Sequence, residues 1–337
     1  MVNYIIYTKG LIRMKRIAFT MAEILLSLTI IGVVAAITLP SLTGNINERT
    51  WNTQRKALYS RISQAVALMP SLNNYGTVKG ATSSTSAVDT AAETFITEGL
   101  SKVLKINNIC DSEHLADCGV PDKYTNHSGA VVSSFPDTLT SLFTLFNGSY
   151  SYTNNSGSLI TTTRSIIDTK VAAFETANGE TLVTYYNPVC NSDMNDINWY
   201  AQDKMCLNFV YDLNGSKGPN TIGKDMGFMT VFYPTDSIVV SVTPVKAGTA
   251  GKTPSDAIRY CRQNDSVMPN IYDLASISLN RMNVRKLPLS GCGSYVSADR
   301  IYVNGRLNLK YIDECTGRVH NNTADAANGI HTYCVRR

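Results

Sequence analysis

The chain has 337 residues, of which 44% are hydrophobic and 17% are charged, enough apolar material for one large folded domain or two modest ones. Its excess of four positive charges is carried by four basic residues of the first 18 positions, which contain no acid: Lys9, Arg13, Lys15 and Arg16. The rest of the chain is close to neutral, which excludes the strongly basic surface expected of a nucleic-acid-binding protein.

An apolar segment of membrane length follows at 19–39, with Glu23 as its only charged residue. At about 1.5 Å per residue, a helix of this length covers the roughly 30 Å hydrocarbon core of a bilayer. The basic residues in front of it predict a cytoplasmic N-terminus and an exported remainder. The small residue nearest to them, Ala18, lies before the apolar run, so removal of the leader 1–18 leaves the helix on the mature protein.

These residues resemble the N-terminus of type IV pilins and of the pseudopilins of type II secretion, whose precursors are cut before a Phe-Thr-x-x-Glu segment. Phe19 takes the first mature position, Glu23 the fifth, Gly32 the fourteenth and Pro40 the twenty-second. Ala18 precedes the cut, where the family usually has glycine.

The resemblance implies cleavage between Ala18 and Phe19 by a prepilin peptidase, methylation of Phe19, and assembly into a filament. It also implies that Glu23 pairs with the new amino group of a neighbouring subunit, or with its own. The expected partners are other pilin subunits and the inner-membrane assembly machinery. The precursor is expected to cross the inner membrane once with its head outside the cytoplasm, and then to enter an extracellular pilus or a periplasmic pseudopilus. The start is Met1 or Met14, since Met14 gives a leader of the usual length.

Proline removes a backbone donor and disfavours helix before it, so Pro40, with Gly44 nearby, predicts a kink or local melting at 39–44. Beyond that point an apolar stripe at helical spacing predicts that the helix resumes and runs to about residue 69. The stripe consists of Trp51, Leu58, Ile62, Ala65 and Met69.

A pilin-like head is expected over 70–243. Polar, small residues predict loops at 73–91 and 147–165, and helices are expected at 93–104 and 137–146. Asn178-Gly179 between two β-prone runs is a strong hairpin signal. The predicted strands are 171–176, 180–186, 206–212 and 227–233. The fold class is therefore α+β, a long N-terminal helix packed on an antiparallel sheet, as the resemblance implies.

Eight cysteines all lie on the exported side, and their even number predicts a disulfide framework. Structural zinc is disfavoured because no Cys-x-x-Cys occurs and the four histidines are scattered. Local spacing suggests the pairs Cys110 with Cys118 and Cys190 with Cys206, although sequence alone does not fix connectivity.

The segment after the third strand has two interpretations. Asp212, Asn214 and Ser216 alternate oxygen-bearing side chains around a glycine, with Asp225 downstream, which suits Ca²⁺. The loop is also similar to the calcium-binding loop of major pseudopilins. Against calcium, the spacing does not complete an EF-hand, Lys217 adds a positive charge, and Asp-x-Asn-Gly is ordinary turn chemistry. Both interpretations stay open, and no other cofactor is expected.

Residues 244–252 are rich in small and basic residues and predict a linker to a C-terminal domain at 253–337. Helices are expected to begin at Pro254 and near Asn270. The runs at 257–261, 268–274, 295–297 and 333–336 resemble small bacterial domains related to the C-type lectin fold. That resemblance implies disulfides joining Cys261 to Cys334 and Cys292 to Cys315.

Three classes of function follow. The first is a structural subunit of a type IV pilus or a type II secretion pseudopilus. The second is a minor tip pilin whose C-terminal domain acts as an adhesin, which the large head favours. The third, a membrane-anchored enzyme, is disfavoured because the chain has no Gly-x-Ser-x-Gly, no P-loop, no metal-binding histidine pair and no catalytic Cys/His grouping.

Overall fold

The structure is a computed structural model, and it describes residues 20–69, 88–142, 149–153, 159–163, 167–188, 190, 199–232, 238–241, 243–250, 254–284, 294–303, 306–313, 317–323 and 330–336. It divides into two units between Thr50 and Trp51. The first contains the N-terminal part of helix α1 (Met21–Leu68), and the second contains the rest of α1 and all the sheets. The class is α+β, as predicted.

Helix α1 is one continuous helix of 48 residues. The predicted local melting at 39–44 is wrong, because a single proline removes one intrahelical donor while the turns on either side keep theirs. Over the part of the chain that the structure describes, no helix combines the length and the apolar character needed to cross a membrane. The structure therefore does not confirm the predicted membrane span.

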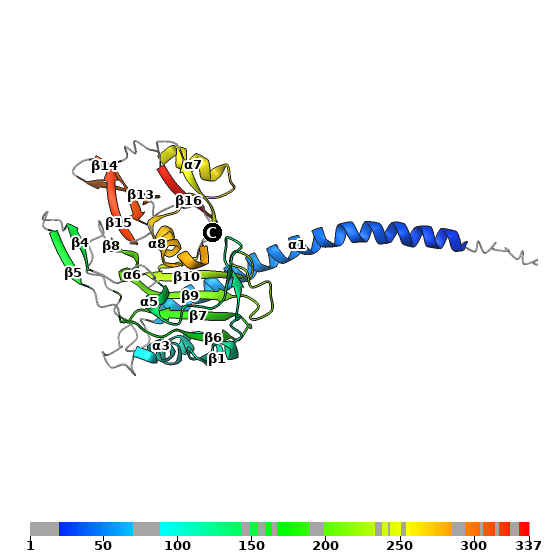
Figure 1. Cartoon of the computed structure of the whole chain (residues 1–337), viewed down its shortest axis with the longest axis horizontal. Helices are drawn as coiled ribbons and strands as arrows, with labels where there is room; N and C mark the ends of the chain where they lie inside the picture. Colours follow the sequence, from blue (N-terminus) through cyan, green and yellow to red (C-terminus); the bar gives the residue numbers. More distant parts are fainter. Residues whose placement is uncertain are drawn as a thin grey trace, which may run out of the picture. The chain divides into compact units, whose positions relative to one another are not determined.

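A six-stranded sheet forms the centre of the second unit, in the order β1-β6-β7-β9-β10-β11, and every neighbouring pair is antiparallel. Figure 1 shows its strands stacked side by side. The predicted Asn178-Gly179 hairpin joins β6 to β7, and Gly179 has the positive φ of 82° that favours glycine there. The bounds are β1 (Ile106–Cys110), β6 (Ala172–Thr176), β7 (Thr181–Tyr186), β9 (Met205–Asp212), β10 (Met226–Phe232) and β11 (Ile238–Ser241).

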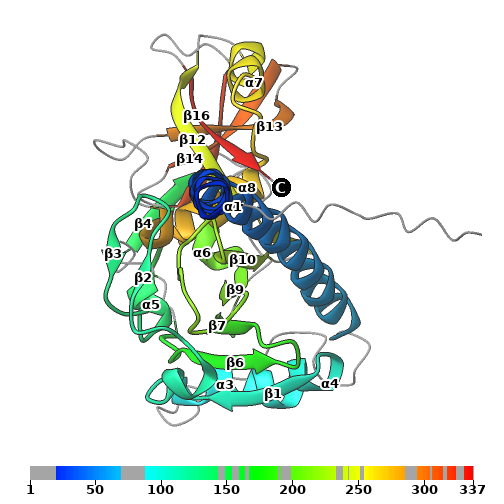
Figure 2. The ribbon, with the colours of Figure 1, turned by 90° about the vertical axis from the view of Figure 1, so that its right-hand side faces the viewer.

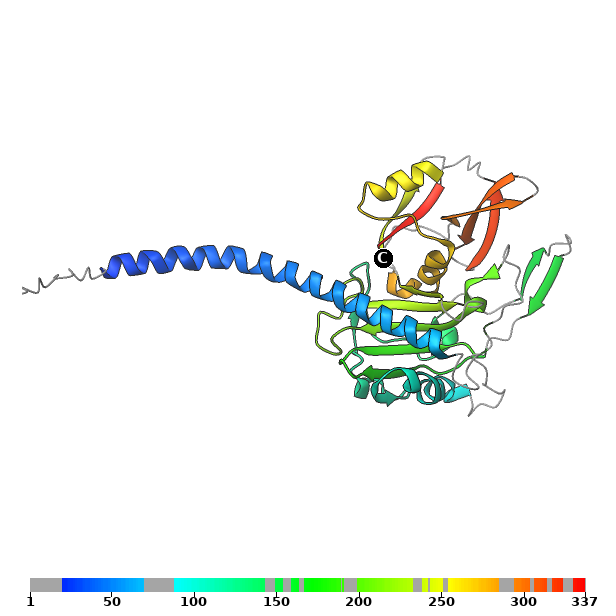
Figure 3. The ribbon, with the colours of Figure 1, turned by 180° about the vertical axis from the view of Figure 1, so that it is seen from behind.

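Alternate residues of these strands supply two hydrophobic layers. On one face Phe174 and Phe209 pack with Leu58 and Ile62 of α1 and with the short helices α3, η2 and α4. Figure 3 shows the lighter blue end of α1 lying across the green strands, and Figure 2 shows α3 and α4 beside β1 and β6. The short helices match the predicted helix at 93–104, and their bounds are α3 (Ala91–Phe95), η2 (Ile96–Leu100) and α4 (Ser101–Val103).

The opposite face is covered by residues from the C-terminal region and from the chain between β1 and β6. This connection contains the turn η3 (Leu115–Cys118), the hairpin of β2 (Tyr124–Thr125) and β3 (Val131–Val132), and the short helix α5 (Leu139–Leu142) within the predicted 137–146. The predicted loop at 147–165 is wrong in part, because β4 (Ser149–Thr153) and β5 (Leu159–Thr163) pair as a hairpin. Threonine and tyrosine favour strands even in a polar segment.

The described part of the predicted linker, up to residue 250, is a strand. β12 (Thr243–Ala250) pairs along its length with β16 (Ile330–Arg336). The local sequence pattern does not reveal this strand, because its pairing partner comes from the far end of the C-terminal region. Both helices begin where the sequence predicts, α7 (Pro254–Arg262) and α8 (Ile271–Leu279), and Asn270 and Asp273 form a capping box at the start of α8. The short helix α9 (Arg281–Val284) follows α8.

The larger sheet of the C-terminal region takes one strand from the predicted head. This four-stranded sheet has the order β13-β14-β15-β8, and β8 (Trp199–Tyr200) comes from the predicted head, just before α6 (Ala201–Lys204). The other strands are β13 (Ser294–Val303), β14 (Arg306–Asp313) and β15 (Arg318–Thr323).

A buried polar network also joins α8 to the central sheet. The side-chain amides of Asn208 on β9 and Asn280 after α8 donate to each other at 2.9 and 2.8 Å. Thr230 on β10 donates to Asn208 at 2.7 Å and lies 2.7 Å from Ser276 of α8. The contact between the predicted domains is buried from solvent to the degree of a protein core. Its four polar residues are all 0% exposed: Asn208, Thr230, Ser276 and Asn280.

Three disulfides are present among the described residues, Cys110 to Cys118, Cys190 to Cys206 and Cys261 to Cys334. The two pairs suggested by local spacing and the outer pair implied by the lectin-like resemblance are thereby confirmed. The remaining predicted pair, Cys292 to Cys315, lies outside the described residues.

Candidate functional site

The N-terminal part of α1 exposes an apolar surface. Between Met21 and Val34, nine large apolar side chains are 47 to 80% exposed. They follow one another closely enough to surround the helix, and a helix that is apolar all round normally lies in a protein core or a bilayer. A surface of this kind marks an interaction site.

Glu23 lies near the start of this surface and forms a capping box with Thr20. Its carboxylate accepts hydrogen bonds from the backbone N–H and the hydroxyl of Thr20, both at 2.9 Å, and its own N–H donates to the Thr20 hydroxyl at 3.3 Å. The carboxylate thus satisfies a backbone donor at the start of α1 while it stays exposed. Gly32 is also exposed, and a Cβ at that position would meet nothing within 4 Å. Ala18 and Phe19, the predicted cleavage site, lie outside the described residues, as does the side chain of Pro40.

The second candidate site is the loop 212–225 between β9 and β10, which we call the acidic loop. Asp212 ends β9, and Asp225 stands directly before β10, where the backbone N–H of Leu213 donates to the Asp225 carbonyl at 3.0 Å. Strand pairing places Asp212 opposite Met226. The two carboxylates, which are 13 positions apart in the sequence, are therefore neighbours at one end of the sheet.

Each carboxylate is buried and partly hydrogen-bonded. Asp225 is 0% exposed, and its two oxygens accept the backbone N–H groups of Asn220 and Thr221, both at 2.9 Å. Asp212 is 2% exposed, and its Oδ1 accepts the backbone N–H of Asn214 at 3.1 Å. Asn220 holds its position with a φ of 47°, a conformation that asparagine tolerates better than most residues.

Burial raises the pKa of Asp212 from its ordinary 3.8 to about 7, although the backbone N–H of Asn214 opposes the shift. The nearby Asp225 carboxylate raises that pKa further. The ionised form of Asp212 beside Asp225 is thus unfavourable unless a positive charge binds near the two carboxylates.

Three buried oxygen atoms of the acidic loop have no hydrogen-bond partner: Asp212 Oδ2, Asn214 Oδ1 and Asn220 Oδ1. Unsatisfied buried acceptors are rare in proteins, and a bound cation is one explanation for a group of them. Carboxylate and amide oxygens are the ligands that Ca²⁺ prefers. The donor set therefore fits this ion.

One of the predicted ligand positions behaves differently from the rest. The structure brings Asp212, Asn214 and Asp225 into one loop, whereas Ser216 is exposed at its tip, as is Lys217. Sequence reasoning missed Asn220, whose only signal was an amide side chain after Gly218-Pro219. No group of three histidine, cysteine, aspartate or glutamate side chains suited to a metal occurs among the described residues, so the amide oxygens are needed to complete this set.

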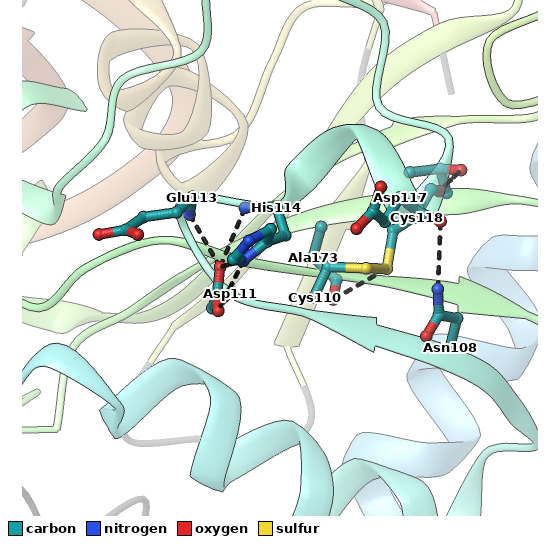
Figure 4. Close-up of a disulfide and its surroundings, with 9 residues drawn as sticks. Asn108, Cys110, Asp111, Glu113, His114, Asp117, Cys118 and Ala173 are labelled. Carbon is teal, nitrogen blue, oxygen red and sulfur yellow. Dashed lines mark hydrogen bonds and ion pairs between the residues drawn. A yellow bond between two sulfur atoms is a disulfide. The ribbon is translucent and has the colours of Figure 1, made fainter.

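The loop closed by Cys110 and Cys118 carries several exposed charged or titratable side chains. Figure 4 shows His114 turned toward Asp111, with its Nδ1 2.8 Å from the carboxylate. Asp111 also accepts the backbone N–H groups of Glu113 and His114, both at 2.9 Å. The hydrogen bond to Asp111 raises the pKa of His114, and the same contact lowers the pKa of Asp111. These hydrogen bonds order the loop, but they do not indicate a catalytic or binding role for it.

Comparison of the chain with protein-family models, with curated proteins and with solved structures finds no match.

Proposed function

We propose that this protein is a pilin-like subunit of a type IV pilus or a type II secretion pseudopilus, assembled through the N-terminal part of α1. The observation that carries the proposal is the exposed apolar surface between Met21 and Val34, with the C-terminal part of the same helix packed on an antiparallel sheet. The first part needs an apolar environment, and the second part carries the head. A bilayer supplies that environment before assembly, and neighbouring helices supply it in the filament.

Glu23 has a specific place in this proposal. A carboxylate in an apolar environment costs several kcal/mol unless it is paired. The capping box with Thr20 satisfies it within one chain, and a cut before Phe19 creates an amine one turn away that offers a stronger, charged partner. Repeated contacts of this kind between identical subunits do not close on themselves, so they build an open helical assembly.

Mass spectrometry of the mature chain from the native host tests this proposal. We expect an N-terminus at Phe19 carrying one methyl group, and filaments that contain the chain. Glu23→Gln should be processed normally but recovered in filaments at less than a tenth of the wild-type amount, because a neutral amide forms no ion pair with the new amine.

Ser27→Ala is the matched control, since the Ser27 hydroxyl bonds only within α1, to the carbonyl of Glu23 at 2.8 Å. It should assemble as the wild type does. An intact Ala18-Phe19 bond in assembled material would overturn the proposal.

We further propose that the acidic loop binds Ca²⁺ and that the ion stabilises the head. The support is the two neighbouring buried carboxylates and the three unpartnered oxygens. When bound, the ion would supply the positive charge that lets Asp212 stay ionised. Asp225, already held by two backbone N–H groups, would keep its orientation throughout.

The pH dependence of stability without metal tests the loop. The pKa of Asp212 is raised by folding to about 7, so its contribution to stability is complete below its unfolded value of 3.8 and is lost as the pH rises through 7. In a chelator, the melting temperature should therefore fall between pH 5.5 and pH 8 more in the wild type than in Asp212→Asn, which stays neutral. Ca²⁺ at pH 8 should raise the wild-type melting temperature and leave that of the variant unchanged.

Equal pH profiles for the two proteins, or a Ca²⁺ response retained by Asp212→Asn, would contradict this assignment. Ser216→Ala is the control, because Ser216 is exposed at the tip of the acidic loop, and it should respond to Ca²⁺ as the wild type does.

A further inference from the structure

One arginine of α1 contacts the acidic loop directly before Asp225. Arg55 donates from Nη2 to the carbonyl of Lys224 at 2.7 Å and to that of Gly223 at 3.4 Å. Burial raises the pKa of Tyr211, and the nearby charge of Arg55 opposes that shift. Tyr211 precedes Asp212, and Lys224 precedes Asp225, so Arg55 lies near the residue before each of the two carboxylates.

These contacts orient the carboxylates through the backbone and are not made to the carboxylate oxygens. The carbonyls of Gly223 and Lys224 belong to the two peptide groups that lead into Asp225, and holding them sets the backbone from which its side chain projects. The ring of Tyr211 lies against Gly227 of β10, where a Cβ would come within 2.2 Å of the Tyr211 hydroxyl oxygen, so the end of β9 is held as well. Arg55 is thus a positioning residue for the acidic loop.

The same side chain belongs to the helix that carries the proposed assembly surface. Arg55 lies one turn before Leu58 and two turns before Ile62, both 0% exposed against the central sheet. At the other side of Arg55, Trp51 is half-buried against the same layer. The contact between Arg55 and the acidic loop therefore forms only when α1 is docked on the sheet.

We propose that Arg55 couples cation binding at the acidic loop to the docking of α1 on the sheet. The inference rests on the calcium site proposed above. If docking of α1 orders the carboxylates, it raises their affinity for the ion, and by linkage the ion must strengthen docking by the same factor. The head then holds its assembly helix more firmly where calcium is abundant, as it is outside the cytoplasm.

Hydrogen exchange and calorimetry on the full chain in detergent, with disulfides intact, test this coupling. In the wild type, Ca²⁺ should slow amide exchange in peptides from 55–66 of α1 several-fold. In Arg55→Gln, the Kd for Ca²⁺ should rise by roughly ten-fold, a typical size for coupling between two sites, and the calcium effect on the α1 peptides should disappear. Arg55→Lys keeps the charge and one donor, so it should fold and show an intermediate Kd.

Two control variants separate coupling from general effects. Lys56→Gln removes one charge from the same turn at an exposed position and should match the wild type. Arg61→Gln breaks the ion pair of α1 with the buried Glu180 but keeps the contacts of Arg55 with the acidic loop, so exchange in α1 should speed up while the response to Ca²⁺ remains.

The outcomes separate the two proposals. If Arg55→Gln binds Ca²⁺ as tightly as Lys56→Gln, and the ion still slows exchange in its α1 peptides, the coupling is wrong while the calcium site stands. If the wild type shows no binding heat and no change in exchange with Ca²⁺, the calcium site itself is wrong and the coupling falls with it.

Discussion

Replacing Asn280 with alanine is expected to lower the free energy of unfolding by about 3 to 5 kcal/mol, one of the largest effects of any single substitution in this chain. Asn280 exchanges two amide hydrogen bonds with Asn208 and accepts a third from Asn283 at 3.2 Å. Its removal leaves these groups unsatisfied where no water reaches them, since Asn208 and Asn280 are 0% exposed. Urea unfolding followed by circular dichroism measures the loss.

The matched control is Asn108→Ala. Asn108 is exposed, and its side chain makes a hydrogen bond of 3.1 Å to the carbonyl of Asp117, so its loss should cost less than about 1 kcal/mol. A double replacement of Asn208 and Asn280 by leucine removes the donors and acceptors together and should recover part of the stability. Equal unfolding midpoints for Asn280→Ala and Asn108→Ala would show that the network does not hold α8 to the sheet.

Removal of the disulfide between Cys261 and Cys334 by a double alanine substitution is expected to cost about 4 to 5 kcal/mol by the loss of loop closure. The two cysteines lie 73 positions apart, join α7 to β16, and are both 0% exposed. The cost should appear as a fall in the melting temperature measured by calorimetry without reductant.

The disulfide between Cys110 and Cys118 provides the comparison, because its cysteines are only 8 positions apart. The same loop-closure argument gives about 2 to 3 kcal/mol for its removal, so this double alanine variant should melt between the wild type and the Cys261, Cys334 variant. The reverse order of melting temperatures would refute an explanation based on loop length.

Local signals predicted the parts of the fold that local physics decides. Asn178-Gly179 predicted a hairpin because Gly179 needs a positive φ. Asn270 predicted the start of α8 because its side chain accepts the N–H of Asp273, at 2.7 Å. Cys110 and Cys118 are close enough in sequence that their pairing is the simplest one.

The other parts of the fold and of the candidate site depend on contacts that local sequence patterns do not reveal. Residues 244–252 are rich in small and basic residues, and those of them that lie in β12 join a sheet only because β16 supplies hydrogen bonds from more distant sequence. In the acidic loop, Asp212, Asn214 and Asp225 were predicted from their side-chain oxygens, whereas Asn220 was not. Its role depends on the backbone conformation at that position and on the N–H that it gives to Asp225.

The placement of β8 has a consequence for folding during synthesis. Tyr200 pairs with Arg318, and Trp199 pairs with Val319, so a growing chain contains residue 200 long before its partner strand is made. Until then Trp199, 1% exposed in the finished structure, lacks both that strand and Tyr272 of α8, on which its indole stacks with the ring centroids 5.5 Å apart. Chains interrupted during synthesis would keep that aromatic surface open to proteases and chaperones, and quality control could thereby separate unfinished chains from complete ones.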